Sequence, residues 1–242
     1  MDETWRETFH SHARTRDYWR RVREAEDVIR GVLDSSQRPY VAFSGGKDST
    51  VMAHLVLDQR PGVLVWHAWS IWRPPEVEAE IDGIAQALGV QRYRVVRGLG
   101  GRLHGQHVPR LLEEGHDRVF VGLRSEESGK RRRRIARRLY ITDIPESWPL
   151  ASWTWMDVWA YIVTHDLPYL SAYDQMAPLV GWDQARTSTF FDPTAVHGDA
   201  SVDGVLFWRL RHQVGQQRGG ACGYPTQNGE PTASLPPVGA GK

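Results

Sequence analysis

The first 140 residues alternate between short apolar runs and stretches in which apolar residues recur at helical spacing. The apolar runs predict buried strands at 40–43, 62–69, 91–98 and 117–123. The helically spaced stretches predict helices at 3–34, 48–59, 74–88, 105–115 and 126–139. Strands that alternate with helices favour a Rossmann-like α/β fold, with a mostly parallel, twisted sheet and helices on both of its faces. Such sheets bind ligands at the carboxyl ends of their strands.

The pattern changes after about residue 140, where Pro, Trp and Tyr are frequent in predicted turns. One further helix is predicted over 154–165, with Thr154 as its cap. The sequence therefore predicts an N-terminal helical segment (1–39), followed by an α/β core (40–145). An irregular, α-rich C-terminal part of the same domain (146–214) comes next, and a flexible tail rich in Gly, Pro, Gln and Ser (215–242) ends the sequence.

The composition is that of one globular domain, because 40% of the 242 residues are hydrophobic and 24% are charged. The formal net charge of +1 gives no overall indication of nucleic-acid binding. Only a local cluster of basic residues could indicate such a partner. The polar N-terminus lacks the apolar core of a signal peptide, and no apolar run approaches the roughly 20 residues that span a bilayer. We therefore expect a cytoplasmic protein with no membrane association.

Cys222 is the single cysteine of the sequence, so no internal disulfide can form. An iron–sulfur cluster usually takes about four thiolates, which one cysteine cannot supply. No iron–sulfur cluster is therefore expected.

Residues 43–50, "FSGGKDST", lie between a predicted strand and a predicted helix and carry the chemistry of a phosphate-binding turn. Gly45 and Gly46 let the backbone approach phosphate oxygens closely, and the helix N-terminus offers unpaired N–H groups to an anion. Lys47 adds a positive charge, and the two flanking hydroxyl residues, Ser44 and Ser49, add donors. Asp48 would repel a bare phosphate, so it is a candidate either to cap the helix or to hold Mg²⁺.

Two common phosphate motifs do not fit this turn. Aligning Gly46-Lys47 with the end of the Walker A pattern places Val41 at its first glycine and Asp48 at its Mg²⁺-binding hydroxyl. The dinucleotide fingerprint GxGxxG is not matched either.

The six residues Ser44-Gly45-Gly46-Lys47-Asp48-Ser49 resemble the PP-loop of the N-type ATP pyrophosphatases, the adenine nucleotide alpha hydrolase superfamily. Three further stretches resemble the phosphoadenosine phosphosulfate (PAPS) reductase family of that superfamily. They are "VGLRSEESGKRRRR" from Val121, "PLASWTWMDVWAYI" from Pro149 and "LPYLSAYDQM" from Leu167.

The resemblance implies a Rossmann-like sheet that binds an adenine nucleotide, with ATP and Mg²⁺ as cofactors. It implies catalytic roles for Lys47 and Arg124. The nucleotide-binding candidates that it implies are Ser44, Gly45, Gly46, Lys47, Asp48, Ser49, Gly122 and Arg124.

Two departures from the family pattern bear on function. The second strand of the family commonly ends in Asp-Thr-Gly, whereas this chain has Trp66-His67-Ala68-Trp69-Ser70-Ile71-Trp72. The base and ribose are therefore expected to be held differently. Sulfonucleotide reductases of the family carry a catalytic cysteine in Glu-Cys-Gly-Leu-His, of which only Cys222-Gly223 remains here. Cys222 is a candidate thiol nucleophile, with an unreactive surface thiol as the alternative.

The segment "KRRRRIARR" at 130–138 holds seven basic residues in nine. A solvated basic face is one interpretation, and binding of a multi-phosphate ligand or a nucleic-acid backbone is the other. The phosphate- or acceptor-binding candidates are Arg131, Arg132, Arg133 and Arg134. Trp66, Trp69 and Trp72 cluster after the second strand, where packing and stacking on a base are the two alternatives.

Three functions remain open on this sequence. The first is an ATP pyrophosphatase that adenylates an acceptor and releases pyrophosphate, in sulfur transfer or nucleic-acid modification. The second is a PAPS reductase that uses Cys222 with thioredoxin, and the third is a non-catalytic nucleotide-binding subunit. The degraded cysteine motif favours the first, whose candidate partners are a nucleic acid, a protein sulfur carrier or a second copy of the chain.

Overall fold

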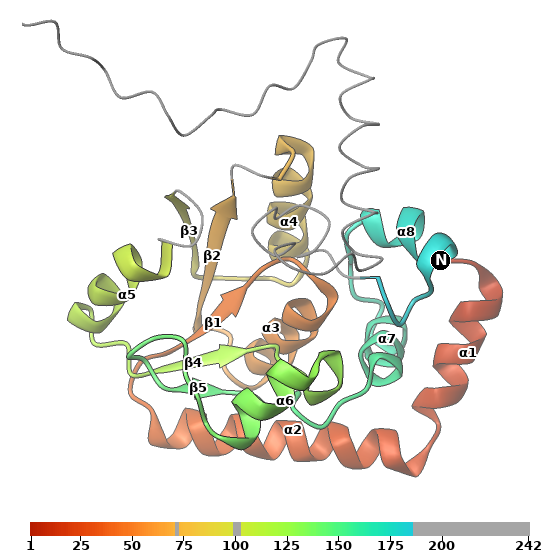
Figure 1. Cartoon of the computed structure of the whole chain (residues 1–242), viewed down its shortest axis with the longest axis horizontal. Coiled ribbons are helices and arrows are strands. Elements are labelled where there is room, and N and C mark those ends of the chain that lie inside the picture. Colours follow the sequence, from red (N-terminus) through yellow and green to blue (C-terminus); the bar gives the residue numbers. More distant parts are fainter. Residues whose placement is uncertain (71–72, 99–102, 186–242) are drawn as a thin grey trace, which may run out of the picture.

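The computed structural model describes residues 1–70, 73–98 and 103–185, and within them the strands form one parallel sheet. The strand order is β3-β2-β1-β4-β5, so β1 lies at the centre (Figure 1). The strands are β1 (Pro39–Phe43), β2 (Leu64–Ser70), β3 (Tyr93–Gly98), β4 (Arg118–Val121) and β5 (Glu146–Ser147). The chain builds outward from β1 to β3 and then returns to the other side of β1. This reversal creates a topological switch point between β1 and β4, where open α/β sheets bind their ligands.

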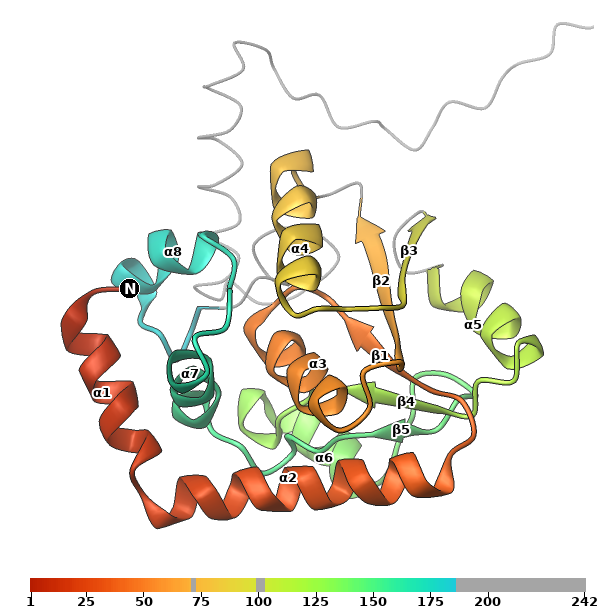
Figure 2. The ribbon, with the colours of Figure 1, turned by 180° about the vertical axis from the view of Figure 1, so that it is seen from behind.

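Helices cover both faces of the sheet (Figures 1 and 2). They are α1 (Glu3–Ala13), α2 (Arg16–Ser35), α3 (Lys47–Gln59), α4 (Pro75–Ala87), α5 (Leu103–Glu113), α6 (Gly129–Ala136), α7 (Trp155–Thr164) and α8 (Ala172–Val180). Val41 and Phe43 of β1 point into the large core, to which α3, α4, α7 and the N-terminal helices contribute. Tyr40 points to the opposite face, into a smaller core with α5. The alternation along β1 thus buries both faces, and the fold class predicted from the sequence is confirmed.

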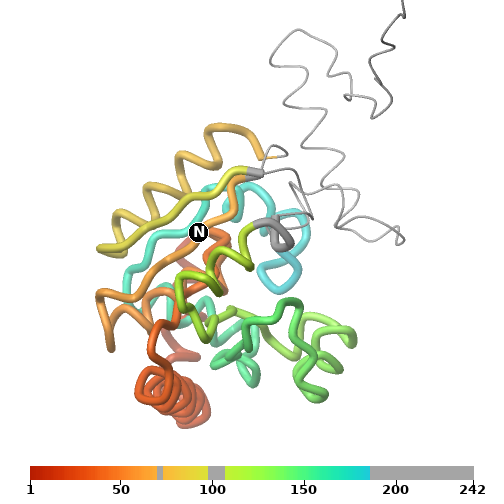
Figure 3. The backbone as a smooth tube through the Cα atoms, turned by 90° about the vertical axis from the view of Figure 1, so that its left-hand side faces the viewer, coloured from red at the N-terminus to blue at the C-terminus, as the bar shows by residue number. Residues whose placement is uncertain are grey.

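The N-terminal segment is two helices, so the prediction of one continuous helix over 3–34 is wrong. α1 ends at Ala13, and Thr15 caps α2 by accepting a hydrogen bond from the N–H of Tyr18. Threonine at such a position satisfies a donor that the first helical turn leaves unpaired. α1 packs on α7, while α2 runs past the core and is seen nearly end-on in Figure 3.

The region after β4 also differs in detail from the sequence prediction. The segment 126–139 is divided into a short 3-10 turn, η2 (Ser125–Glu127), and α6, because Ser128 caps the second helix. The predicted cap of α7 is confirmed, since Thr154 and Asp157 form a capping box. β5 and α8 were not predicted, because β5 has two residues and α8 contains Pro178.

The predicted tail 215–242 and Cys222 lie outside the described residues. In the part of the chain that the structure describes, no helix is long and apolar enough to cross a membrane.

Candidate functional site

The PP-loop segment joins the central strand to the N-terminus of α3. Gly45 has φ +74°, and a Cβ atom there would lie 2.4 Å from Cγ1 of Ile81 in α4. Both the left-handed backbone and the close approach therefore require glycine at this position. The Ser44 hydroxyl lies 3.0 Å from that of Ser49, which in turn donates to the carbonyl of Gly46. These bonds hold the turn in one shape around the start of the helix.

Lys47 is the first residue of α3 and is buried, with 1% of its side chain exposed. Its Nζ donates to the carbonyl oxygen of Ala185 at 3.0 Å and lies 3.4 Å from Oδ2 of Asp48. Its backbone N–H donates to the hydroxyl of Tyr173, and Nζ lies 5.3 Å from the centre of the Tyr173 ring. The ammonium group is therefore placed by contacts from three segments of the chain.

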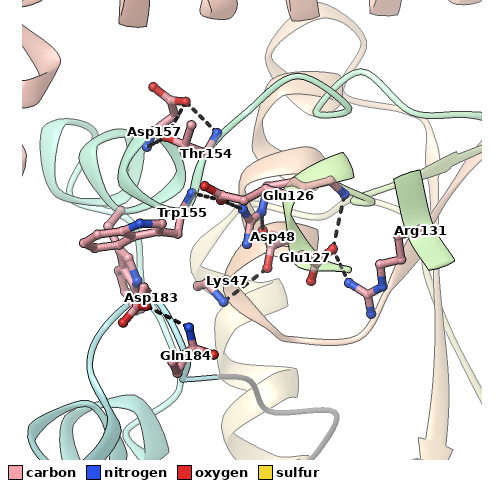
Figure 4. Close-up of polar contacts among 12 residues, drawn as sticks. Lys47, Asp48, Glu126, Glu127, Arg131, Thr154, Trp155, Asp157, Asp183 and Gln184 are labelled. Atoms are coloured by element: carbon pink, nitrogen blue, oxygen red, sulfur yellow. Dashed lines mark hydrogen bonds and ion pairs between the residues drawn. The ribbon is translucent and has the colours of Figure 1, made fainter. Parts of the chain in front are cut away.

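Asp48 and Arg124 form an ion pair between α3 and the segment that follows β4. Nε of Arg124 donates to Oδ1 of Asp48, and its Nη1 donates to Glu126 at 2.7 Å. Burial alone would raise the pKa of Asp48, but the charges of Lys47 and Arg124 outweigh it and lower that pKa to about 2. The carboxylate therefore stays ionised at neutral pH, next to Lys47 on the same helical turn (Figure 4).

Gly122 brings the end of β4 against the start of α3. A Cβ atom on Gly122 would lie 2.7 Å from the carbonyl oxygen of Asp48 and 3.1 Å from the backbone nitrogen of Ser49. These are backbone atoms, so they cannot move aside as a flexible side chain could. Glycine is thus required sterically at the switch point.

A cavity of about 350 Å³ opens over these residues, within the size range of small-molecule sites. Its lining comes from the carboxyl ends of β1, β2 and β4, the PP-loop, the 3-10 turn, α6 and α8. The loop side is polar and carries Lys47 and Asp48. The sheet side is largely apolar and is formed by Ala42, Trp66, Ala68 and Val121. The cavity thus combines an anion-binding end with an apolar wall.

Most of the predicted site residues converge on this cavity. The lining includes Ser44, Gly46, Lys47, Asp48, Ser49 and Gly122, while Gly45 shapes the turn next to them. Arg131 and Arg134 line it as well, whereas Arg132 and Arg133 do not. Arg124 was expected to contact the nucleotide, but the structure buries it behind Asp48 and outside the lining.

Three polar residues of the lining were not predicted from the sequence, namely Tyr173, Glu127 and Arg73. Glu127 is buried and forms an ion pair with Arg131, which Figure 4 shows beside Asp48. Tyr173 and Glu127 lie inside segments that carry the family resemblance, so that signal was present in the sequence. Arg73 precedes α4 and carries no such signal.

A metal site built from protein side chains alone is not found in the described residues, which contain no group of three His, Cys, Asp or Glu residues able to hold an ion.

The chain is similar in sequence to a known protein domain and to several named proteins. The profile of the phosphoadenosine phosphosulfate reductase domain matches residues 106–188. Sulfate adenylyltransferase subunit 2 of Methylococcus capsulatus is 27% identical over 198 residues, covering 62% of this chain and 65% of that protein. The same subunit of Mycobacterium tuberculosis is 32% identical over 195 residues, covering 62% of each chain.

Among solved structures, the PAPS reductase of Candida auris superimposes with a TM-score of 0.48 at 15% identity. The superposition covers 62% of this chain and 84% of that one. The chain spans a little under two thirds of the length of the two curated relatives.

Proposed function

We propose that this chain, whose residues 106–188 match the phosphoadenosine phosphosulfate reductase domain, is a PP-loop enzyme that binds ATP and transfers AMP to an acceptor with release of pyrophosphate. The observation that carries this proposal is the buried Lys47, which lies at a helix N-terminus on the polar side of a nucleotide-sized cavity. A buried ammonium group next to the N-terminal N–H groups of a helix is suited to a polyphosphate.

Lys47 is positioned to exchange its present partner for a phosphate. Its Nζ donates to a neutral carbonyl oxygen of Ala185, and an ionised phosphate oxygen is a stronger acceptor than a carbonyl. In the proposed reaction an acceptor oxygen attacks the α-phosphorus, the bond to the bridging oxygen breaks, and pyrophosphate leaves with the electron pair. Lys47 and the N-terminus of α3 would stabilise the negative charge that grows on the leaving group.

The opposite side of the cavity suits the base. Ala42 and Ala68 are small, and with Trp66 and Val121 they form an apolar wall at the strand ends. An adenine ring placed against this wall would leave its phosphates directed toward Lys47. Trp66 of β2 is paired with Ala42 of β1 in the sheet. In this chain, which lacks the Asp-Thr-Gly of the family, Trp66 would contact the base instead.

Mg²⁺ fits this arrangement in a limited role. Mg²⁺ in nucleotide sites takes one or two carboxylates together with phosphates and waters. Asp48 offers one ionised carboxylate, whose Oδ2 lies 3.4 Å from Nζ of Lys47. When bound, Mg²⁺ would neutralise phosphate charge. Arg124 would act by fixing the orientation of Asp48, which makes it a positioning residue.

The acceptor and the partners are open to direct test. The relatives are named for adenylyl transfer to sulfate and as one subunit of an enzyme, so sulfate and a partner subunit are the first candidates to examine. The alternative of a PAPS reductase depends on Cys222, which lies outside the described residues. A non-catalytic nucleotide-binding subunit is the third alternative.

Release of pyrophosphate from ATP by the full chain tests the proposal, with and without sulfate. Lys47→Ala should lower the rate by about 10²–10³, the usual effect of removing one donor to developing charge. Arg30→Ala removes a charge on the exposed surface of α2 and serves as the matched control, with an unchanged rate expected. Equal rates for Lys47→Ala and the wild type would exclude the proposed role of Lys47. Formation of sulfite from PAPS with thioredoxin would instead support the reductase.

A further inference from the structure

A second hollow, of about 500 Å³, borders α6 and the turn that follows it. We call this surface the α6 groove, and its lining residues are Lys130, Arg131, Arg133, Arg134, Arg137, Leu139, Tyr140 and Ile141. The proposed nucleotide chemistry does not account for this surface. It combines five basic residues with three apolar ones.

The α6 groove carries a concentrated positive charge. Residues 129–142 contain seven basic residues and no acidic residue. Glu127 and Glu146 neutralise Arg131 and Arg134 by ion pairs. Within the described residues no ion pair involves Lys130, Arg133 or Arg137, so three cations of the groove are left for a partner.

The apolar side of the groove is held in a fixed position. Buried Glu146 accepts hydrogen bonds from the backbone N–H of Ile141 at 2.8 Å and from Nε1 of Trp148 at 2.8 Å, as well as from Arg134. Nε of Arg134 also donates to the carbonyl of Leu139. These bonds hold the turn while the side chains remain exposed, 40% for Tyr140 and 62% for Ile141. The backbone is thus fixed on both sides of Tyr140, whose half-exposed ring lies 5.5 Å from that of Trp148.

Arg131 and Arg134 connect the two hollows, because both residues line the nucleotide cavity and the α6 groove. A molecule in the groove therefore lies next to the cavity in which ATP is proposed to bind. The acceptor of the adenylyl group would need this position.

From these observations we infer that the α6 groove binds a single-stranded nucleic acid and presents it as the acceptor. The inference deepens the proposed function and rests on it for the chemical step. An oxygen of the strand would attack the α-phosphorus of ATP, and pyrophosphate would leave with the electron pair of the broken bond.

The dimensions and chemistry of the groove agree with such a ligand. Lys130 and Arg137 are seven residues apart, which is roughly 10 Å along a helix axis, long enough to contact more than one phosphate of a strand. Single-stranded nucleic acids bind basic grooves that also offer an aromatic ring for stacking, here Tyr140. Protein interfaces are depleted of charge at their centres, which makes an acidic protein the less suitable occupant.

The inference can be tested by measuring how tightly the full chain binds a labelled 12-nucleotide oligouridylate. Fluorescence anisotropy reports this binding at salt concentrations between 50 and 200 mM. The double variant Arg133→Ala/Arg137→Ala should weaken binding at least about 10-fold at the lowest salt. It should also reduce the slope of log K against log salt by about 1.4, because each of the two lost phosphate contacts contributes about 0.7 to that slope. Tyr140→Ala should weaken it by about 5- to 150-fold, the equivalent of one stacked base.

Arg30→Ala/Arg92→Ala removes the same charge from exposed positions outside the groove and should bind like the wild type. Equal binding by the groove variants, or equal weakening by the control, would overturn the inference. So would displacement of the oligonucleotide by polyglutamate at equal charge concentration, which would assign the groove to acidic protein chains.

ATP binding by the same proteins separates this inference from the proposed function. Arg133 and Arg137 do not line the nucleotide cavity, so their double variant should retain the ATP affinity of the wild type. A wild type that fails to bind ATP contradicts the proposed function. If the wild type binds ATP but the groove variants bind the oligonucleotide as tightly as the wild type does, only the inference about the α6 groove is contradicted.

Discussion

Asp48 is an acidic residue in a turn built to hold an anion, and its neighbours explain how the turn tolerates it. Lys47 and Arg124 both lie against its carboxylate and stabilise its negative charge. Arg124 in turn is 1% exposed and pairs also with Glu126. A buried cation of this kind is costly once it loses its partner, which ties the stability of the loop to the ionisation of Asp48.

Asp48→Asn should therefore destabilise the protein in a pH-dependent way. The pKa of Asp48 is lowered in the folded state to about 2, so its contribution is present above the unfolded pKa and is lost as the pH falls through the folded one. A shift from about 3.8 to about 2 corresponds to about 2 kcal/mol at pH 7, and about half of it should remain at pH 3. Urea unfolding of both proteins at the two pH values measures the difference. A gap that stays constant between pH 7 and pH 3 would contradict this origin.

At the scale of elements, the switch point depends on how closely β4 approaches α3. The two elements contact through the missing Cβ of Gly122, while Gly45 allows the loop to pass α4. The cavity lies over this junction, so a small separation of the two elements would change the spacing between its walls.

Gly122→Ala should weaken both stability and ATP binding. The added methyl group would lie 2.7 Å from a backbone oxygen, and such overpacking typically costs about 1–3 kcal/mol. Gly129→Ala is the matched control, because a Cβ there meets no atom within 4 Å and alanine favours the helix of which it is the first residue. Thermal unfolding and ATP titration compare the two variants. Equal behaviour of Gly122→Ala and Gly129→Ala would show that the close approach has no consequence for the site.

The sequence predicted the elements whose signals are local and missed those that depend on tertiary packing. The strands near 40–43 and 117–123, and the PP-loop between a strand and a helix, follow from apolar periodicity and glycine placement. The break at Thr15 was hidden, because apolar residues continue at helical spacing on both sides of it. The burial of Arg124 behind Asp48 joins residues that are 76 positions apart, and no local pattern reports such a contact.

For the whole molecule, the N-terminal helices are part of the common core. Phe9 of α1 is fully buried and its ring lies about 6 Å from those of Trp155 and Trp159 in α7. Arg21 of α2 donates to both carboxylate oxygens of Asp157, whose side chain is buried. The segment predicted as a separate part of the chain is therefore joined to α7 by both aromatic packing and an ion pair.

Phe9→Ala should consequently destabilise the entire described fold as one unit. Truncating a buried phenylalanine typically costs about 3–5 kcal/mol, because it removes apolar contacts and leaves a cavity. Arg30→Ala is the control on α2, since that side chain is 61% exposed and surface substitutions usually change stability by less than about 0.5 kcal/mol. Urea unfolding followed by both tryptophan fluorescence and circular dichroism should give a single transition, shifted equally by the two probes. If Phe9→Ala instead produced an early partial transition, with the remainder unfolding at the wild-type midpoint, then residues 1–39 would form a separable unit and the common core would begin at β1.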